Sequence, residues 1–174
     1  TRPIGSVIGA VAGLVFVLVN AGAISGSLLW RTVAVVVFVA ILWFVILRGP
    51  EIDQPPPGRA ALRTYWISVV AMSVAIPVGA AIINNVLDKP NAVLVWVVFV
   101  VGVHFLPFAR AFQLPVFRWL AVCLVVVAAI AAVPTLAFNS ATASGATGVA
   151  AGFVLLIFSA VGPRLSNRAT TPLT

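Results

Sequence analysis

His104, the only histidine in the chain, is the residue best suited to chemistry, because it lies inside a long apolar run. Ionisable side chains at membrane depth are costly and usually face the interior of a helix bundle or a cavity. An imidazole in such a position suits a proton-accepting site in transport or an axial ligand to a haem. The structural alternative is a neutral imidazole that is hydrogen-bonded to a backbone carbonyl, such as the one freed by Pro107. We consider this structural role the more common one for a histidine in such a position.

Three prolines inside apolar runs are a second kind of irregularity. Pro77, Pro107 and Pro134 lack an N–H, so each leaves a carbonyl four residues earlier without its helical partner. In some transporters such positions mark broken helices around a central binding site. More often a proline only bends the helix. Pro107 is the binding-site candidate among them, because it lies one turn from His104.

Asparagines near the ends of the apolar runs complete the candidate site. Asn20, Asn84 and Asn85 lie at the ends of the first and third runs, and Asn139 follows the fifth. Asparagines at helix ends usually form caps and turns, and this is their expected default role. The functional alternative is that they line an entrance or hydrogen-bond helices together. The candidate solute-binding residues are therefore His104, Asn84, Asn85, Asn20 and Pro107.

The chain lacks the partners that most catalytic and metal sites need. Its three acidic residues, Glu51, Asp53 and Asp88, are expected in loops, so no predicted span holds a carboxylate. Cys123 is the only cysteine and forms no intrachain disulfide. A single histidine also excludes a haem held by two histidines of one chain. We therefore expect no enzyme activity, no metal site and no cofactor.

Composition places the chain in a membrane. Hydrophobic residues make up 63% of its 174 residues, charged residues only 7%, and the mean hydropathy is +1.22. A soluble domain has about a quarter of its residues charged. The net charge of +7 comes from basic residues scattered singly at the ends of apolar runs, which indicates membrane orientation and not nucleic-acid binding.

Six apolar runs are long enough to cross a bilayer, which takes about 20 helical residues. They predict a single all-α domain, an integral membrane bundle of six transmembrane helices, at about residues 4–24, 28–47, 64–86, 92–109, 119–138 and 144–162. The first run, preceded by Arg2, also has the layout of a signal peptide, but it is long enough to span and is expected to be retained. Residues 165–174 are predicted to form a polar, disordered tail.

The predicted connections differ in character. Residues 48–63 form the longest polar stretch, and three consecutive prolines at 55–57 exclude a helix there. Residues 110–118 are predicted to be a short amphipathic connection whose phenylalanines suit the membrane interface. Residues 139–147 are small and polar and predict a loop, with an alternative start of the sixth helix as early as Ala141.

Basic residues gather on one side of this six-span arrangement. The eight arginines on the side of both termini are Arg2, Arg48, Arg59, Arg63, Arg110, Arg118, Arg164 and Arg168. Only Arg31 and Lys89 fall on the other side. By the positive-inside rule both termini are expected to be cytoplasmic. Because arginine, alanine and valine predominate, we expect a bacterial source and the plasma (inner) membrane.

Glycines recur every four residues in two of the runs. Gly5, Gly9 and Gly13 share one face of the first predicted helix, and Gly148 and Gly152 share one face of the sixth. Faces of small residues allow helix backbones to approach closely. These five glycines are therefore predicted helix-packing residues, either inside the bundle or between copies of the chain.

Two functions fit these features. The first is binding or transport of a small, neutral or apolar solute within the bundle, at His104 and the asparagines. The second is a noncatalytic subunit or scaffold of a larger membrane complex or homo-oligomer, set in the lipid bilayer and docked through the face of Gly5, Gly9 and Gly13. The first function requires a polar cavity that reaches His104, whereas the second predicts a dry core and an exposed face of small residues.

Overall fold

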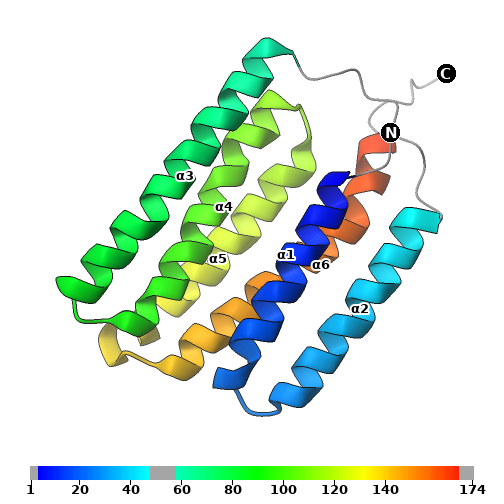
Figure 1. The fold of residues 1–174 in the computed structure, drawn as a ribbon. Helices are drawn as coiled ribbons and strands as arrows, with labels where there is room; N and C mark the ends of the chain where they lie inside the picture. The colour runs from blue at the N-terminus through cyan, green and yellow to red at the C-terminus, as the bar shows by residue number, and fades with distance from the viewer. Residues whose placement is uncertain (1–3, 48–57, 169–174) are drawn as a thin grey trace.

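The computed structural model describes residues 4–47 and 58–168 of the chain. Six antiparallel α-helices form one bundle (Figure 1), and each is long and apolar enough to cross a membrane. They are α1 (Ile4–Asn20), α2 (Ser27–Leu47), α3 (Arg59–Asn85), α4 (Val93–Ala111), α5 (Pro115–Phe138) and α6 (Ala141–Arg168). Two short 3-10 helices, η1 (Ala21–Ala23) and η2 (Pro90–Ala92), precede α2 and α4. The prediction of an all-α bundle of six spanning helices is confirmed.

Each described connection between helices turns on a residue in the left-handed backbone region. These residues and their φ angles are Gly26 (73°), Asp88 (52°), Gln113 (54°) and Asn139 (48°). Glycine, and to a lesser degree asparagine and aspartate, reach this region at low cost. Pro115 then begins α5 at a position where its missing N–H costs no helical hydrogen bond. The connections are therefore short, and the helices that they join lie antiparallel.

Helices extend beyond the apolar runs in three places. α3 begins at Arg59 and not near residue 64, residues 112–114 alone separate α4 from α5, and α6 runs from Ala141 to Arg168. The predicted loop at 139–147 therefore shrinks to 139–140, and residues 165–168 of the predicted tail are helical. Hydropathy marks the part of a helix that lies in lipid, but polar residues continue the helix where water reaches their side chains. The prolines at 55–57 and residues 169–174 lie outside the described residues.

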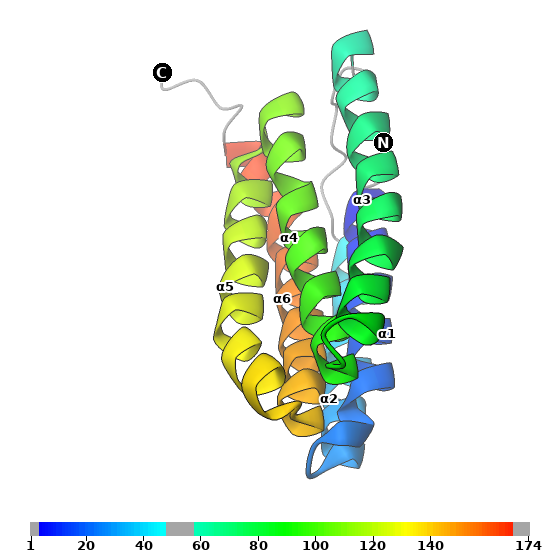
Figure 2. The same ribbon diagram turned by 90° about the vertical axis from the view of Figure 1, so that its left-hand side faces the viewer.

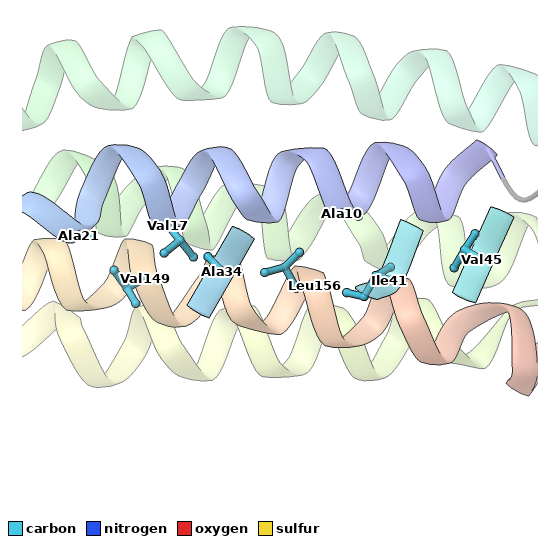
Figure 3. Close-up of a cluster of buried hydrophobic side chains, with 8 residues drawn as sticks. All are labelled: Ala10, Val17, Ala21, Ala34, Ile41, Val45, Val149 and Leu156. Carbon is cyan, nitrogen blue, oxygen red and sulfur yellow. The ribbon is translucent and has the colours of Figure 1, made fainter. Parts of the chain in front are cut away.

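α6 is the central helix, because two hydrophobic clusters meet on it. One cluster joins α6 to α1, η1 and α2, and its buried side chains are shown in Figure 3. The other joins α6 to α4 and α5. Val149 and Leu156 belong to the first cluster, and Ala151 and Leu155 belong to the second. Because successive helical residues are rotated by about 100°, these pairs lie on different sides of α6.

Small residues allow α1 and α6 to pack backbone against backbone. Gly13 faces Gly152, and a Cβ atom on Gly9 would lie 2.6 Å from Oγ of Ser159. Gly148 lies against the side chain of Asn20. Gly5, by contrast, has nothing in the described chain within 4 Å of where its Cβ atom would be. The predicted glycine face therefore packs inside the chain, and Gly5 takes no part in it.

α3 lies at the edge of the bundle and is packed on one side only. Among the described elements it contacts α4 and η2, and it contributes no residue to either hydrophobic cluster. Figure 1 shows α3 at the left margin, with α4 between it and α5, and Figure 2 looks onto the bundle from that side. The outer face of α3 exposes a stripe of apolar side chains, Trp66, Val70, Val74, Val78 and Ile82. Such a face is stable in lipid and not in water.

Candidate functional site

A groove of about 560 Å³ between α3 and α4 reaches His104. Its lining, here called the α3–α4 groove, consists of Thr64, Ile67, Ser68, Ala71, Met72 and Ala75 from α3 and Trp96, Phe99, Val100, Val103, His104 and Pro107 from α4. Both sets follow the three- and four-residue spacing of one helix face and extend about 16 Å along the helix. The groove is open on one side, where Ile67, Phe99 and Val103 are exposed at the outer surface of the bundle.

Ser68 and His104 join the two walls of the groove. Oγ of Ser68 lies 2.8 Å from Nδ1 of His104 and 3.3 Å from the carbonyl oxygen of His104. The carbonyl oxygen of Ser68 lies 3.2 Å from the same Nδ1. The serine is buried and the imidazole is partly buried. The imidazole therefore has a carbonyl partner, as expected, and this partner is Ser68 of α3. It is not Val103, whose carbonyl Pro107 leaves without a helical hydrogen bond.

Nε2 of His104 is the side-chain polar atom of the groove lining that no described residue engages. The other polar lining side chains are Thr64, Ser68 and Trp96, and each has a hydrogen-bond partner. Every fully buried side-chain nitrogen or oxygen in the described part of the chain has a partner, so Nε2 is not fully buried. A molecule in the groove would therefore meet one accessible hydrogen-bonding side-chain atom among otherwise apolar or already paired side chains.

Aromatic rings from three helices hold the imidazole in place. The ring of Phe108 meets His104 edge-on at a centroid distance of 4.5 Å, and it stacks on Tyr65 of α3 at 5.4 Å. Phe105 lies 5.6 Å from the imidazole and stacks on Phe117 of α5 at 5.7 Å. Phe117, expected at the membrane interface, thus joins a connected cluster of aromatic rings around His104, and this cluster restricts rotation of the imidazole.

Trp96 marks the other end of the groove. Its indole N–H donates a hydrogen bond to the carbonyl oxygen of Ala75 at 2.9 Å. The indole rests against Gly79 of α3, and a Cβ atom on this glycine would overlap the ring. The absence of a side chain at Gly79 therefore admits Trp96 between the two helices. The Trp96 and His104 contacts together attach α3 to α4.

The predicted solute-binding residues do not converge on one site. His104 and Pro107 line the same groove. Asn84 and Asn85 are exposed at the opposite end of α3. They lie sixteen and seventeen residues beyond Ser68, which corresponds to about 24 Å along the helix. The two asparagines of α3 therefore cannot act together with His104.

Asn20 and Asn139 have structural contacts at helix ends. The amide of Asn20 donates to the carbonyl oxygen of Phe16 at 2.8 Å. Oδ1 of Asn139 accepts the backbone N–H of Asn91 at 3.2 Å, and the carbonyl oxygen of Asn139 accepts the side-chain amide of Asn91 at 2.7 Å. The turn between α5 and α6 is thereby tied to the turn between α3 and α4.

Ser68 and Trp96 are groove residues that the sequence interpretation missed. A hydroxyl group inside an apolar run was one available signal, because polar groups in lipid seek partners on neighbouring helices. Ser73 is an equally polar residue of the same helix, yet it is exposed. Nothing in the local sequence distinguishes these two serines, and only the packing of α3 on α4 shows which one faces His104.

The six helices indicate a polytopic membrane protein, and the groove on its side is the candidate site. Among the described residues, no group of three or more His, Cys, Asp and Glu side chains is placed to hold a metal ion. No protein-family model, no curated protein and no solved structure matches the chain. The chemistry of the groove is therefore the basis for a functional assignment.

Proposed function

We propose that this protein binds a small, largely apolar solute in the α3–α4 groove, as an integral membrane protein without catalytic activity. The observation that carries the proposal is an apolar groove with one accessible polar side-chain atom, Nε2 of His104, that no described residue engages. Sites for small molecules are typically mostly apolar cavities of about 300–1,000 Å³ in which a few polar groups fix the orientation of the ligand. The volume and lining of the groove match this type of site.

The position of the groove favours a lipid-soluble ligand. The groove opens at the outer surface of α3 and α4, where exposed apolar side chains such as Ile67 and Phe99 face the surroundings. A solute reaches it from the lipid, without passing the close contact between α1 and α6. The first function was expected to require a polar cavity that reaches His104, but the groove that reaches this residue is apolar, so the solute proposed here is an apolar one. Transport of the solute would require movement of α3, which contacts only α4 and η2 among the described elements.

Charges at the helix ends support an orientation with cytoplasmic termini in the proposed bacterial plasma membrane. Arg59, Arg110 and Arg118 lie at the ends of α3, α4 and α5 that share one side of the bundle. Arg31 and Lys89 lie at the opposite side. The positive-inside rule assigns the arginine-rich side to the cytoplasm. His104 then lies in the half of the membrane nearer the cytoplasm.

The alternative of a noncatalytic subunit or scaffold has less support. It depended on an exposed face of small residues on the first helix, but Gly9 and Gly13 face α6 of the same chain. The exposed apolar residues of α3 form the kind of surface that any helix presents to lipid. No feature of the described surface requires a second protein.

Photolabelling tests the binding proposal. The protein in lipid nanodiscs is irradiated with 3-trifluoromethyl-3-phenyldiazirine, an apolar photoreactive probe, and the labelled peptides are mapped by mass spectrometry. We expect labelling of the groove lining to saturate with probe concentration and to be competed by hexylbenzene. Labelling of the groove that rises linearly, like that of the lipid-facing side of α2, would show that the groove is not a binding site.

Two phenylalanine substitutions in α3 distinguish probe binding in the groove from labelling of the lipid-facing surface. Ala71→Phe adds a ring to the lining, so saturable labelling should be lost. Ala81→Phe adds the same ring at an exposed position outside the groove, so saturable labelling should persist. Equal effects of the two substitutions would contradict the assignment of the binding site to the groove.

A further inference from the structure

We infer that the solute donates a hydrogen bond to Nε2 of His104 and is therefore a membrane-soluble alcohol or phenol. This inference rests on the proposed binding function of the α3–α4 groove and specifies the chemical class of its ligand. It follows from the way in which Ser68 determines the tautomer of the imidazole.

The contacts between Ser68 and His104 assign the proton of the neutral ring to Nδ1. With a proton on Nδ1, the ring donates to Oγ of Ser68 at 2.8 Å and to the carbonyl oxygen of Ser68 at 3.2 Å. Oγ of Ser68 is then free to donate its own proton to the carbonyl oxygen of His104 at 3.3 Å. All three contacts are hydrogen bonds in this arrangement.

The opposite tautomer satisfies fewer of these contacts. With the proton on Nε2, Oγ of Ser68 donates to Nδ1, so it no longer donates to the carbonyl of His104. The lone pair of Nδ1 then faces the lone pairs of the Ser68 carbonyl oxygen at 3.2 Å. Two acceptors at that distance repel each other, so the hydrogen-bonding network favours the Nδ1–H tautomer.

A ring protonated on Nδ1 presents Nε2 to the groove as an acceptor. An acceptor that faces an apolar groove without a donor costs free energy, and a ligand that supplies the donor removes this cost. A hydroxyl group is the neutral donor that a lipid-soluble molecule most simply carries. A ketone or an ether offers only acceptors and would leave Nε2 unpaired. The site therefore discriminates by hydrogen-bond direction, even between ligands of nearly equal shape.

The remaining lining orients the body of the ligand. From His104 the groove extends along α4 to Trp96, eight residues or about 12 Å away, past Phe99, Val100 and Val103. The indole N–H of Trp96 already donates to the carbonyl of Ala75, so it offers no donor to a second polar group. The groove thus suits a molecule with a single hydroxyl group at one end and an apolar body of this length.

A matched pair of ligands tests the inference by nuclear magnetic resonance. The protein is labelled with ¹⁵N-histidine, which gives one pair of imidazole nitrogen signals because the chain has one histidine. The ligands are 4-hexylphenol and its methyl ether, 4-hexylanisole, which lacks the donor. Ligand concentrations are expressed as mole fractions in the detergent micelle. Ala71→Phe, in which the new ring fills the groove, measures the background binding of both ligands.

We expect the ligand-free spectrum to show a protonated Nδ1 and an unprotonated Nε2. The phenol should shift the Nε2 signal and bind about tenfold more tightly than the ether, because one hydrogen bond separates them. His104→Ala should make the two affinities equal. The measurements on the unsubstituted protein test the inference even if that variant does not fold.

Three outcomes would overturn the inference, and they are distinguishable. A proton on Nε2 in the ligand-free protein would contradict the tautomer. Equal binding of phenol and ether to the unsubstituted protein, lost in Ala71→Phe, would disprove the donor requirement but leave the groove as a binding site. Binding of both ligands no stronger than in Ala71→Phe would eliminate the proposed function and the ligand class together.

Discussion

A Cβ atom on Gly13 would lie 2.6 Å from the carbonyl oxygen of Gly152, and a Cβ atom on Gly152 would lie 2.6 Å from the carbonyl oxygen of Gly13. The two glycines therefore face each other across the contact between α1 and α6. In lipid, the hydrophobic effect does not drive helices together, so close van der Waals packing of this kind is a main source of association. The contact positions α6, on which both hydrophobic clusters meet.

Alanine substitutions along α1 should show a graded loss of stability. Gly13→Ala places its methyl group against backbone, which cannot rotate away, so we expect a loss of about 1–3 kcal/mol in the free energy of unfolding. Gly9→Ala meets the hydroxyl of Ser159, which can change rotamer at the cost of its hydrogen bond to the carbonyl oxygen of Leu155, so we expect a smaller loss than for a clash with backbone. Gly5→Ala is the control and should be close to neutral. Unfolding in detergent measures all three, and a Gly5 variant as unstable as the Gly13 variant would contradict the intramolecular contact.

Gly79→Ala should loosen the attachment of α3. The added methyl group would overlap the indole of Trp96, so the ring must move and its hydrogen bond to Ala75 should break. We expect amide hydrogen exchange to increase along α3 while that of α5 stays unchanged, because α3 contributes no residue to the hydrophobic clusters. Gly58→Ala has open space around its Cβ atom and serves as the control. Unchanged exchange in Gly79→Ala would show that the indole does not hold α3.

Ser68→Ala should lower the free energy of unfolding slightly, and Ser73→Ala should leave it almost unchanged. The alanine removes Oγ, but the carbonyl oxygen of residue 68 remains 3.2 Å from Nδ1 of His104, so the ring keeps one acceptor. Hydrogen bonds between helices in lipid contribute about 0.6 kcal/mol on average, and we expect a loss of this size in the free energy of unfolding. Ser73 is exposed on the same helix and provides a matched control. Equal losses for the two serines would contradict the interhelical bond.

Substitutions of Asn139 should separate its backbone role from its side-chain role. Asn139→Gly keeps easy access to the left-handed conformation but removes the acceptor for the N–H of Asn91. Asn139→Ala removes the acceptor and also strains the backbone, at a cost of roughly 1–2 kcal/mol. We therefore expect alanine to lower the unfolding midpoint more than glycine does. Asn84→Ala, at an exposed position, is the control. If this control lowered the unfolding midpoint as much as Asn139→Ala does, the role assigned to Asn139 in the turn would be contradicted.

The sequence alone determined the class of fold. Hydropathy identified six spanning helices, because a chain in lipid must satisfy its backbone hydrogen bonds within each helix. The four-residue spacing of Gly9 and Gly13, and of Gly148 and Gly152, indicated close packing on two particular faces. His104 and Pro107 were also recognised as one local feature, since they lie one turn apart on α4 and need no tertiary contact to be neighbours.

Only the tertiary structure decided where the helices meet and what the candidate site contains. It placed the glycine face inside one chain, paired Ser68 with His104, and separated Asn84 and Asn85 from the groove. The physical reason is that these helices are apolar on nearly every side, since lipid accepts the same side chains as the core does. Hydrophobic periodicity therefore does not show which side of α3 faces α4, and that choice depends on shape and a few interhelical hydrogen bonds, which exist only after the helices have packed.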